Sequence, residues 1–364
     1  MFLPKTIAND SKPSRKMVST AISFSLLPIK LIKEETRMAS ADRRKNSIVK
    51  EFGHFTCRCA AIEKRIQKLN NFLIDGGFGS LEQNGLIYRQ NIFIRSFEIG
   101  FDRKLSLAAL TNFLQDTALN HVRMIGLLAA GFGSTPEMSK KDLIWVLCTL
   151  QILVDRHPSW LDAVEVDTWM YPSGQNGQGR DWLVRDAKTG KPLAQASSVM
   201  VLLNKKTRKL SKFTEEIRDE IAPHMMMDCN PIINSRKMLP FDVNTADYAR
   251  TGLTPGWNDL DLNQHVNHVQ YINWILQNVL RSLIQHHKLS DITLEYRKEC
   301  DINSILQFLS KIVKNGSNHS TDTNNLIELD HSLLLENGSE IARANTIWKP
   351  REVNNFKNAV YTPA

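Results

Sequence analysis

The feature that most limits the fold of this chain is a pattern of one long helix followed by several strands, which occurs twice. Apolar residues at helical spacing predict a helix at residues 105–128 and a second helix at residues 266–283. Each helix is followed by runs rich in β-forming residues. The predicted strands are residues 143–155, 163–170, 181–186 and 193–204 in the first half, and 292–300, 304–313, 326–335 and 340–348 in the second.

A short internal repeat links the two halves. Residues 189–199 read Thr-Gly-Lys-Pro-Leu-Ala-Gln-Ala-Ser-Ser-Val, and residues 337–347 read Asn-Gly-Ser-Glu-Ile-Ala-Arg-Ala-Asn-Thr-Ile. Each combines a glycine-containing turn with an alternating strand, which is typical of a β-hairpin. A long helix against several antiparallel strands, present twice, predicts an α+β fold. Periodicity alone does not choose among the α+β folds.

The charge of the chain is unevenly distributed. The net charge is +8, yet residues 1–50 hold 11 of the 46 Lys and Arg residues and 4 of the 38 Asp and Glu residues. The remainder is nearly neutral, and no basic patch with interleaved aromatic residues indicates binding to DNA or RNA. A basic, hydroxyl-containing segment with few acids is typical of a plastid or mitochondrial transit peptide. No apolar run reaches the roughly 20 residues that a transmembrane helix needs.

The five cysteines predict neither disulfides nor a metal site. Cys57, Cys59, Cys148, Cys229 and Cys300 show no disulfide framework, which is consistent with a reducing compartment. The spacing of Cys57 and Cys59 is too tight and too isolated for a zinc site. Nothing in the sequence calls for a metal or an organic cofactor.

The segment at residues 259–268, Asp-Leu-Asp-Leu-Asn-Gln-His-Val-Asn-His, holds the strongest candidate for chemistry. If it is extended, Asp261, Asn263 and His265 point the same way, because residues two apart share a face of a strand. The second predicted helix starts directly afterwards, and free N–H groups at a helix start favour developing negative charge. Any one of these residues alone is more often a helix cap or a structural polar group. Together they favour a site that polarises a carbonyl.

This segment resembles the signature of plant acyl-acyl-carrier-protein thioesterases. Residues 294–300, Leu-Glu-Tyr-Arg-Lys-Glu-Cys, begin like the B class (FatB-like) of that family, which acts on saturated acyl chains. The resemblance covers about residues 76–350 and implies hydrolysis of the thioester of saturated fatty acyl-acyl-carrier protein. Free fatty acid would be released, ending fatty acid biosynthesis in the plastid (chloroplast) stroma. Further matching runs lie at residues 89–91, 96–100, 117–122, 131–138, 165–169 and 245–248.

The resemblance also implies a tandem double hotdog, in which each long helix is wrapped by an antiparallel sheet. Neither of two alignments of the halves gives the first half an equivalent of Asp261, Asn263 and His265, so the second half is expected to be catalytic. A short helix is expected near residues 59–73. The expected division is a transit peptide and disordered extension at 1–75, an acyl-binding N-terminal hotdog at 76–214, a linker at 215–245, a catalytic C-terminal hotdog at 246–350 and a tail at 351–364.

The resemblance assigns catalysis to Asp261, Asn263, His265, Glu299 and Cys300. Glu299 is expected to activate water, while His265 and Asn263 position that water and hydrogen-bond the carbonyl. Asp261 is expected to orient Asn263 or His265, and helix N–H groups near residue 266 to complete the oxyanion site. Cys300 remains an alternative, covalent nucleophile. Adjacent residues in a regular strand face opposite ways, which favours Glu299 over Cys300.

Three residues depart from the family pattern, Gly256, His268 and Asn273, and an unfamiliar charged stretch replaces the hydrophobic segment that usually precedes the folded core. They put the rate and the chain-length preference in doubt. An acyl-CoA thioesterase and a non-catalytic acyl-binding paralogue are the alternatives.

The expected partner is the acidic acyl-carrier protein, which would need exposed basic residues near the tunnel mouth. Residues 205–209 with Lys212 are one candidate surface, and Arg297 with Lys298 is another. The sequence leaves open the preferred acyl length, the start at Met1 or Met17, the transit cleavage site and the formation of a homodimer. Acyl length is expected to depend on bulky residues that line the tunnel, with Phe113, Met124 and Trp145 as candidates.

Overall fold

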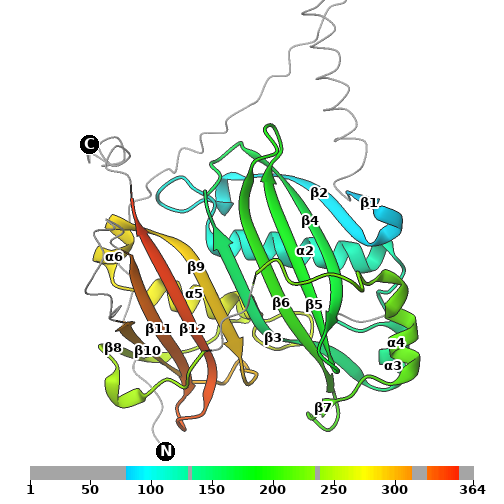
Figure 1. Ribbon diagram of the computed structural model, residues 1–364. Coiled ribbons are helices and arrows are strands. Elements are labelled where there is room, and N and C mark those ends of the chain that lie inside the picture. Colours follow the sequence, from blue (N-terminus) through cyan, green and yellow to red (C-terminus); the bar gives the residue numbers. More distant parts are fainter. Residues whose placement is uncertain (1–78, 130–132, 234–237, 314–325, 352–364) are drawn as a thin grey trace, which may run out of the picture. The chain divides into compact units, whose positions relative to one another are not determined.

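The computed structural model describes residues 79–129, 133–233, 238–313 and 326–351 (Figure 1). The predicted transit peptide, the helix expected near residues 59–73 and nearly all of the predicted C-terminal tail lie outside these ranges.

A single antiparallel sheet runs through both halves of the described residues (Figure 1). Its order is β1-β2-β4-β5-β6-β3-β9-β12-β11-β10-β8, and β7 pairs with β6 beside this path. The strands are β1 (Ser80–Glu82), β2 (Ile87–Phe93), β3 (Leu143–Val154), β4 (Ala163–Ser173), β5 (Gly177–Asp186), β6 (Pro192–Asn204), β7 (Leu210–Ser211), β8 (Tyr248–Leu253), β9 (His287–Tyr296), β10 (Leu306–Val313), β11 (Ile327–Leu335) and β12 (Glu340–Pro350).

The two halves have the same topology. In the first half the order β2-β4-β5-β6-β3 surrounds one helix, and in the second β8-β10-β11-β12-β9 surrounds another. β3 and β9 pair with each other, from Thr149 opposite Glu295 to Leu153 opposite Asp291, and so join the halves. Both predicted hairpins are confirmed, since β5 pairs with β6 and β11 with β12.

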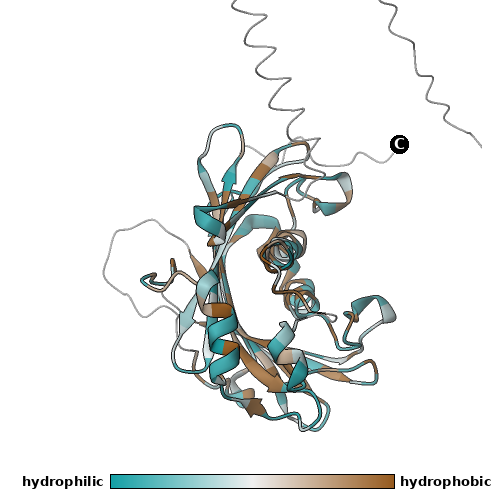
Figure 2. Ribbon diagram, turned by 90° about the vertical axis from the view of Figure 1, so that its right-hand side faces the viewer, coloured by the Kyte–Doolittle hydropathy of each residue, from teal (hydrophilic) through white to brown (hydrophobic). Residues whose placement is uncertain are grey.

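The long helices lie in the concave face of the sheet, as the end-on view in Figure 2 shows. α2 (Leu107–Met124) begins at the cap Ser106, whose side chain accepts from the Ala109 N–H, and packs on β2 and β4. α5 (His268–Asn278) packs on β10 and on α2. This arrangement confirms the expected double hotdog. The shorter helices are α3 (Pro136–Lys140), α4 (Glu215–Ile221) and α6 (Arg281–His286), with 3₁₀ turns at Gln83–Gly85, Ser96–Glu98, Ala222–His224, Val243–Thr245 and Trp257–Asp259.

The boundaries of one predicted helix and one predicted strand were wrong. The helix predicted at 266–283 starts at His268 and is interrupted at Val279, whose extended backbone (ψ 145°) precedes α6. The strand predicted at 292–300 is β9, which begins earlier and ends at Tyr296. The predicted linker at 215–245 opens with α4, which buries Ile217 and Ile221. Of the described helices, none is both long enough and apolar enough to cross a bilayer.

One apolar core serves both halves. Buried side chains of α2, α5 and the inner sheet face form a single cluster. Trp182 on β5 also ties the sheet to α2, because its indole N–H donates to the Leu114 carbonyl at 2.9 Å. Representative core residues are Leu110, Phe113, Leu114, Ile152, Ile272, Ile275, Ile292 and Leu294.

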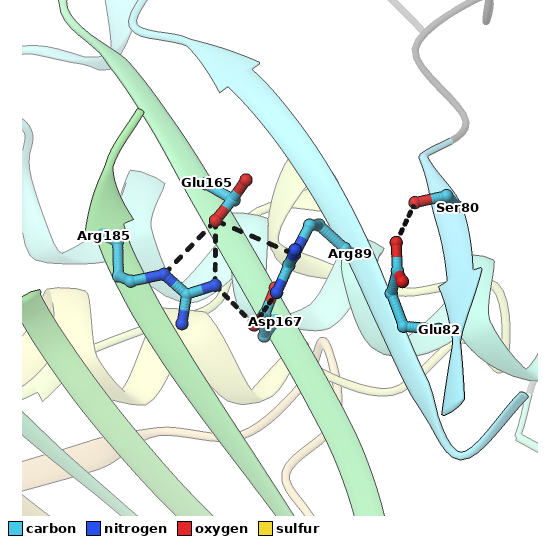
Figure 3. Close-up of polar contacts among 6 residues, drawn as sticks. All are labelled: Ser80, Glu82, Arg89, Glu165, Asp167 and Arg185. Carbon is cyan, nitrogen blue, oxygen red and sulfur yellow. Dashed lines mark hydrogen bonds and ion pairs between the residues drawn. The ribbon is translucent and has the colours of Figure 1, made fainter. Parts of the chain in front are cut away.

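A network of two arginines and two carboxylates crosses β2, β4 and β5 (Figure 3). Arg89 donates to both oxygens of Asp167, at 2.7 and 2.9 Å, and Arg185 pairs with Glu165 at 2.8 Å and with Asp167. Burial raises the pKa of Asp167, but the hydrogen bonds from Arg89 and Arg185 outweigh burial, and the net pKa lies below its usual value. The network therefore links three neighbouring strands.

Candidate active site

A cavity of about 670 Å³ is lined by residues of both halves. This volume lies within the range of roughly 300–1,000 Å³ that small-molecule pockets occupy. Side chains of α2, β3 and β6 supply much of an apolar wall that suits an alkyl chain, among them Leu114, Leu119, Val122, Trp145, Leu147 and Met200. Of the three bulky residues considered from the sequence, only Trp145 lines the cavity. Phe113 is buried in the core, and Met124 is exposed.

The second half contributes Asp261, Asn263, His265 and Glu299 to the same cavity. The extended conformation predicted for residues 261–265 is wrong, because the segment is a turn closed by the Asp261 N–H donating to the His265 carbonyl at 2.8 Å. One Asp261 oxygen accepts from the N–H groups of Asn263 (2.8 Å) and His265 (3.3 Å). This turn, rather than an extended strand, brings the three side chains to the cavity.

The His265 ring faces Glu299. Its Nδ1 lies 2.9 Å from the Asn263 carbonyl, which can only accept, so Nδ1 carries the proton of that contact. Its Nε2 is then turned toward the Glu299 carboxylate, with 3.5 Å between Nε2 and Oε2. The side chains of His265 and Glu299 are 38% and 40% exposed, which is consistent with a place at the mouth of the cavity. A second partner of Glu299 is Arg208, which forms an ion pair with it.

Cys300 is placed differently from the other four candidates. It is 2% exposed, belongs to the apolar core and is not among the residues that line the cavity. Burial raises the pKa of its thiol, which disfavours the thiolate that a nucleophile needs. Glu299 and Cys300 follow β9 in an irregular segment, so their separation does not come from strand alternation.

Two of the N–H groups near the start of α5, where an oxyanion site was expected, make other hydrogen bonds. The Val266 N–H donates to the Cys300 carbonyl at 3.1 Å. The Asn267 side chain caps α5 by accepting from the Val269 N–H at 2.9 Å. These two N–H groups are therefore occupied, and the use of helix N–H groups near residue 266 in an oxyanion site stays a prediction.

The three residues that depart from the family pattern, Gly256, His268 and Asn273, have different surroundings in the structure. His268 lines the cavity, and burial lowers its pKa to about 4, so the ring is neutral. The Asn273 side chain donates to the Gln270 side chain at 3.0 Å on the same helix. Gly256 is exposed, and its N–H donates to Asp259 at 2.7 Å.

Sequence reasoning missed two arginines that line the cavity. Arg208 was noticed only as part of a basic run, and no local pattern predicts its contact with Glu299. Arg180 is almost fully buried, and its Nη1 lies 3.2 Å from both His121 Nδ1 and Thr168 Oγ1. Burial lowers the pKa of Arg180 to about 9. β5 carries two arginines, Arg180 and Arg185, and no pattern in the sequence distinguishes the one that lines the cavity.

The sequence matches two family models and several plant proteins. Residues 85–221 match the family model of the acyl-ACP thioesterase N-terminal domain, and residues 243–350 match that of the C-terminal domain. The palmitoyl-acyl carrier protein thioesterase of Arabidopsis thaliana is 49% identical over 78% of this chain and 69% of its own length. The protein of the same name from Cuphea hookeriana is 48% identical, over 78% of this chain and 68% of its own length.

A solved structure extends the likeness to three dimensions. The 12:0-ACP thioesterase from Umbellularia californica has a TM-score of 0.68 and 42% identity, covering 75% of this chain and 99% of that one. Both family models, the high identity to the plant enzymes and the shared fold lead to one conclusion. The chain belongs to the acyl-ACP thioesterase family.

Proposed function

We propose that this protein hydrolyses the thioester of saturated fatty acyl-acyl-carrier protein in the plastid stroma, releasing free fatty acid and ending fatty acid synthesis. The observation that carries the proposal is the pair His265 and Glu299, 3.5 Å apart at an apolar cavity, in a chain of this family. The plant relatives named above are described as chloroplastic palmitoyl-acyl carrier protein thioesterases, which supports a saturated long-chain substrate and a plastid location.

In the proposed mechanism Glu299 is the general base. It takes a proton from water while the water oxygen bonds to the thioester carbonyl carbon. His265 positions the water by accepting a hydrogen bond from it at Nε2, and the Asn263 side chain donates a hydrogen bond to the oxygen that becomes negative. Collapse of the tetrahedral intermediate breaks the carbon–sulfur bond, and the thiolate takes up the proton that Glu299 accepted from water. Asp261 keeps Asn263 and His265 in place through their backbone N–H groups.

The placement of Cys300 supports attack by water rather than by an enzyme thiol. A covalent mechanism needs a thiolate within reach of the carbonyl, together with a base in contact with it. Cys300 Sγ instead makes its hydrogen bond to the Asp301 carbonyl at 3.7 Å. We therefore assign Cys300 a packing role beneath the site.

The carrier protein is proposed to dock at the basic turn between β6 and β7. Lys205, Lys206 and Lys209 flank Arg208 in the sequence of this turn, and Lys212 follows β7; all four lysines are exposed, and Lys206 is paired with Asp142. Arg208 itself lines the cavity, so the turn lies at the cavity mouth. An acidic partner would be attracted to this charge and oriented by it. Lys298, which also lines the cavity, adds a positive charge from the second half, whereas Arg297 lines it but is paired with Glu295 and Glu340.

The test is thiol release by the full chain from saturated acyl-carrier-protein esters of graded length, with the matching acyl-CoA esters alongside. Release by the parent and by Cys300→Ala, but not by Glu299→Ala, is the expected result. Loss confined to Cys300→Ala would establish the covalent mechanism instead. Equal or faster turnover of the CoA esters would identify an acyl-CoA thioesterase, and acyl binding without release would identify a non-catalytic paralogue.

A further inference from the structure

Two hairpin turns of this protein have the same backbone geometry. One joins β5 to β6 and runs from Asp186 to Gly190, and the other joins β6 to β7 and runs from Asn204 to Arg208. In each, the N–H of the fifth residue donates to the carbonyl of the first, at 2.8 and 2.9 Å respectively. In each, the side chain of the first residue accepts from the N–H groups of the third and fourth residues at 2.9–3.0 Å.

The fifth residue has a left-handed backbone in both turns, but it is a glycine in one and an arginine in the other. Gly190 has φ 71° and Arg208 has φ 55°. Glycine adopts this conformation without a steric penalty, whereas a residue with a Cβ is strained there. The fold of the turn therefore favours glycine at both positions and gives no reason for an arginine at the second. Strain of this kind is often retained where a side chain has a function.

The Arg208 side chain makes a contact that the Gly190 turn lacks. Its guanidinium forms the ion pair with Glu299, and it lines the cavity. Arg208 belongs to the first half and Glu299 to the segment after β9 in the second, so the ion pair connects the two halves at the reaction site. Glu299 lies outside any strand, and this ion pair is a means of fixing its direction.

We propose that Arg208 is a positioning residue that holds the Glu299 carboxylate ionised and directed at the cavity. The proposal rests on the proposed function, in which Glu299 is the base. A neighbouring cation favours the charged form of a carboxylate, and an oriented base needs less reorganisation in the transition state. His265 is the other group in contact with Glu299, at 3.5 Å. The remaining charged or titratable groups that line the cavity are Cys148, Arg180, Asp261, His268, Tyr271, Tyr296, Arg297 and Lys298, of which Arg297 is paired with Glu295 and Glu340.

The test compares Arg208→Gly, Arg208→Lys and Arg103→Gly in the full chain. Arg103 is a matched control, because it is an exposed arginine with φ 59° that does not line the cavity. Both glycine variants relieve backbone strain, so we expect melting temperatures at or above that of the parent. In Arg208→Gly, kcat should fall at least tenfold with little change in KM, and the acid limb of the pH–rate profile should move up by about one unit. Arg208→Lys should restore the position of that limb.

A measurement that does not need turnover separates this inference from the proposed function. Carboxyl ¹³C NMR, with the Glu299 signal identified by its loss in Glu299→Gln, should show a higher pKa for Glu299 in Arg208→Gly than in the parent and in Arg103→Gly. An unchanged Glu299 pKa, or a rise in KM alone, would overturn the positioning role. If the parent releases thiol from no ester, the proposed function fails, and the NMR titration still decides whether Arg208 controls the ionisation of Glu299.

Discussion

At the scale of single residues, the Asp261 carboxylate organises the proposed site through the backbone. One of its oxygens accepts from two backbone N–H groups and so sets the turn that carries Asn263 and His265. Asp261→Asn keeps an acceptor oxygen at this place, whereas Asp261→Ala removes it. We expect kcat to fall about 100-fold in the alanine variant, since small misplacements of reacting groups have effects of that size, and clearly less in the asparagine variant. An equal loss of kcat in the two variants, measured in steady-state assays, would show that the charge of Asp261 matters rather than its support of the turn.

A second residue-scale prediction concerns Asp167 in the network of Figure 3. The pKa of Asp167 is lower in the folded state than the unfolded value of 3.8. Its ionised carboxylate therefore stabilises the folded protein fully above pH 3.8, and this stabilisation is lost as the pH falls through the lowered pKa. Asp167→Asn should reduce the free energy of unfolding at pH 7 by about 1–3 kcal/mol, since one arginine partner is 36% exposed and partly screened. Urea titrations should show this difference narrowing below pH 4. A difference that does not change with pH would contradict the assignment.

At the scale of elements, the wall of the cavity and the core beneath it have different roles. Trp145 on β3 lines the cavity and packs on Phe213, with ring centroids 5.5 Å apart. Trp145→Ala should enlarge the acyl space and shift the preference toward longer chains, measured as relative kcat/KM over the graded esters. The matched variant Phe113→Ala empties a core position that does not line the cavity. It should lower the free energy of unfolding by about 3–5 kcal/mol and leave the length preference unchanged.

The outcome of that pair decides between two views of specificity. If Phe113→Ala also changes the preferred length, packing of α2 rather than the cavity wall sets the acyl length. If Trp145→Ala changes only stability, the acyl chain does not reach Trp145.

At the scale of the whole molecule, the two halves act as one unit in the described residues. β3 pairs with β9, and the core cluster and the cavity draw on both halves. Arg351 also reaches from the second half to Asp102 in the first, at 2.8 Å. We expect a single calorimetric transition for the two halves. We also expect no thiol release by residues 243–351 alone, because β9 would lose its partner β3 and the acyl wall would be missing. Two separate transitions would contradict this coupling.

The sequence by itself determined the features that depend on local chemistry. Alternation, helical spacing and glycine in tight turns predicted the two helices, most strands and both hairpins, and the motifs at residues 259–268 and 294–300 identified the family and four of the residues that line the cavity. These signals are local because backbone conformation and turn chemistry act over a few residues.

Only the tertiary structure decided which side chains meet. The turn at Asp261, the end of β9 before Glu299 and the burial of Cys300 depend on packing against other elements. The contact of Arg208 with Glu299 joins residues far apart in the chain and in different halves. No pattern within either segment encodes that contact, because it exists only when β3 and β9 bring the two halves into one sheet.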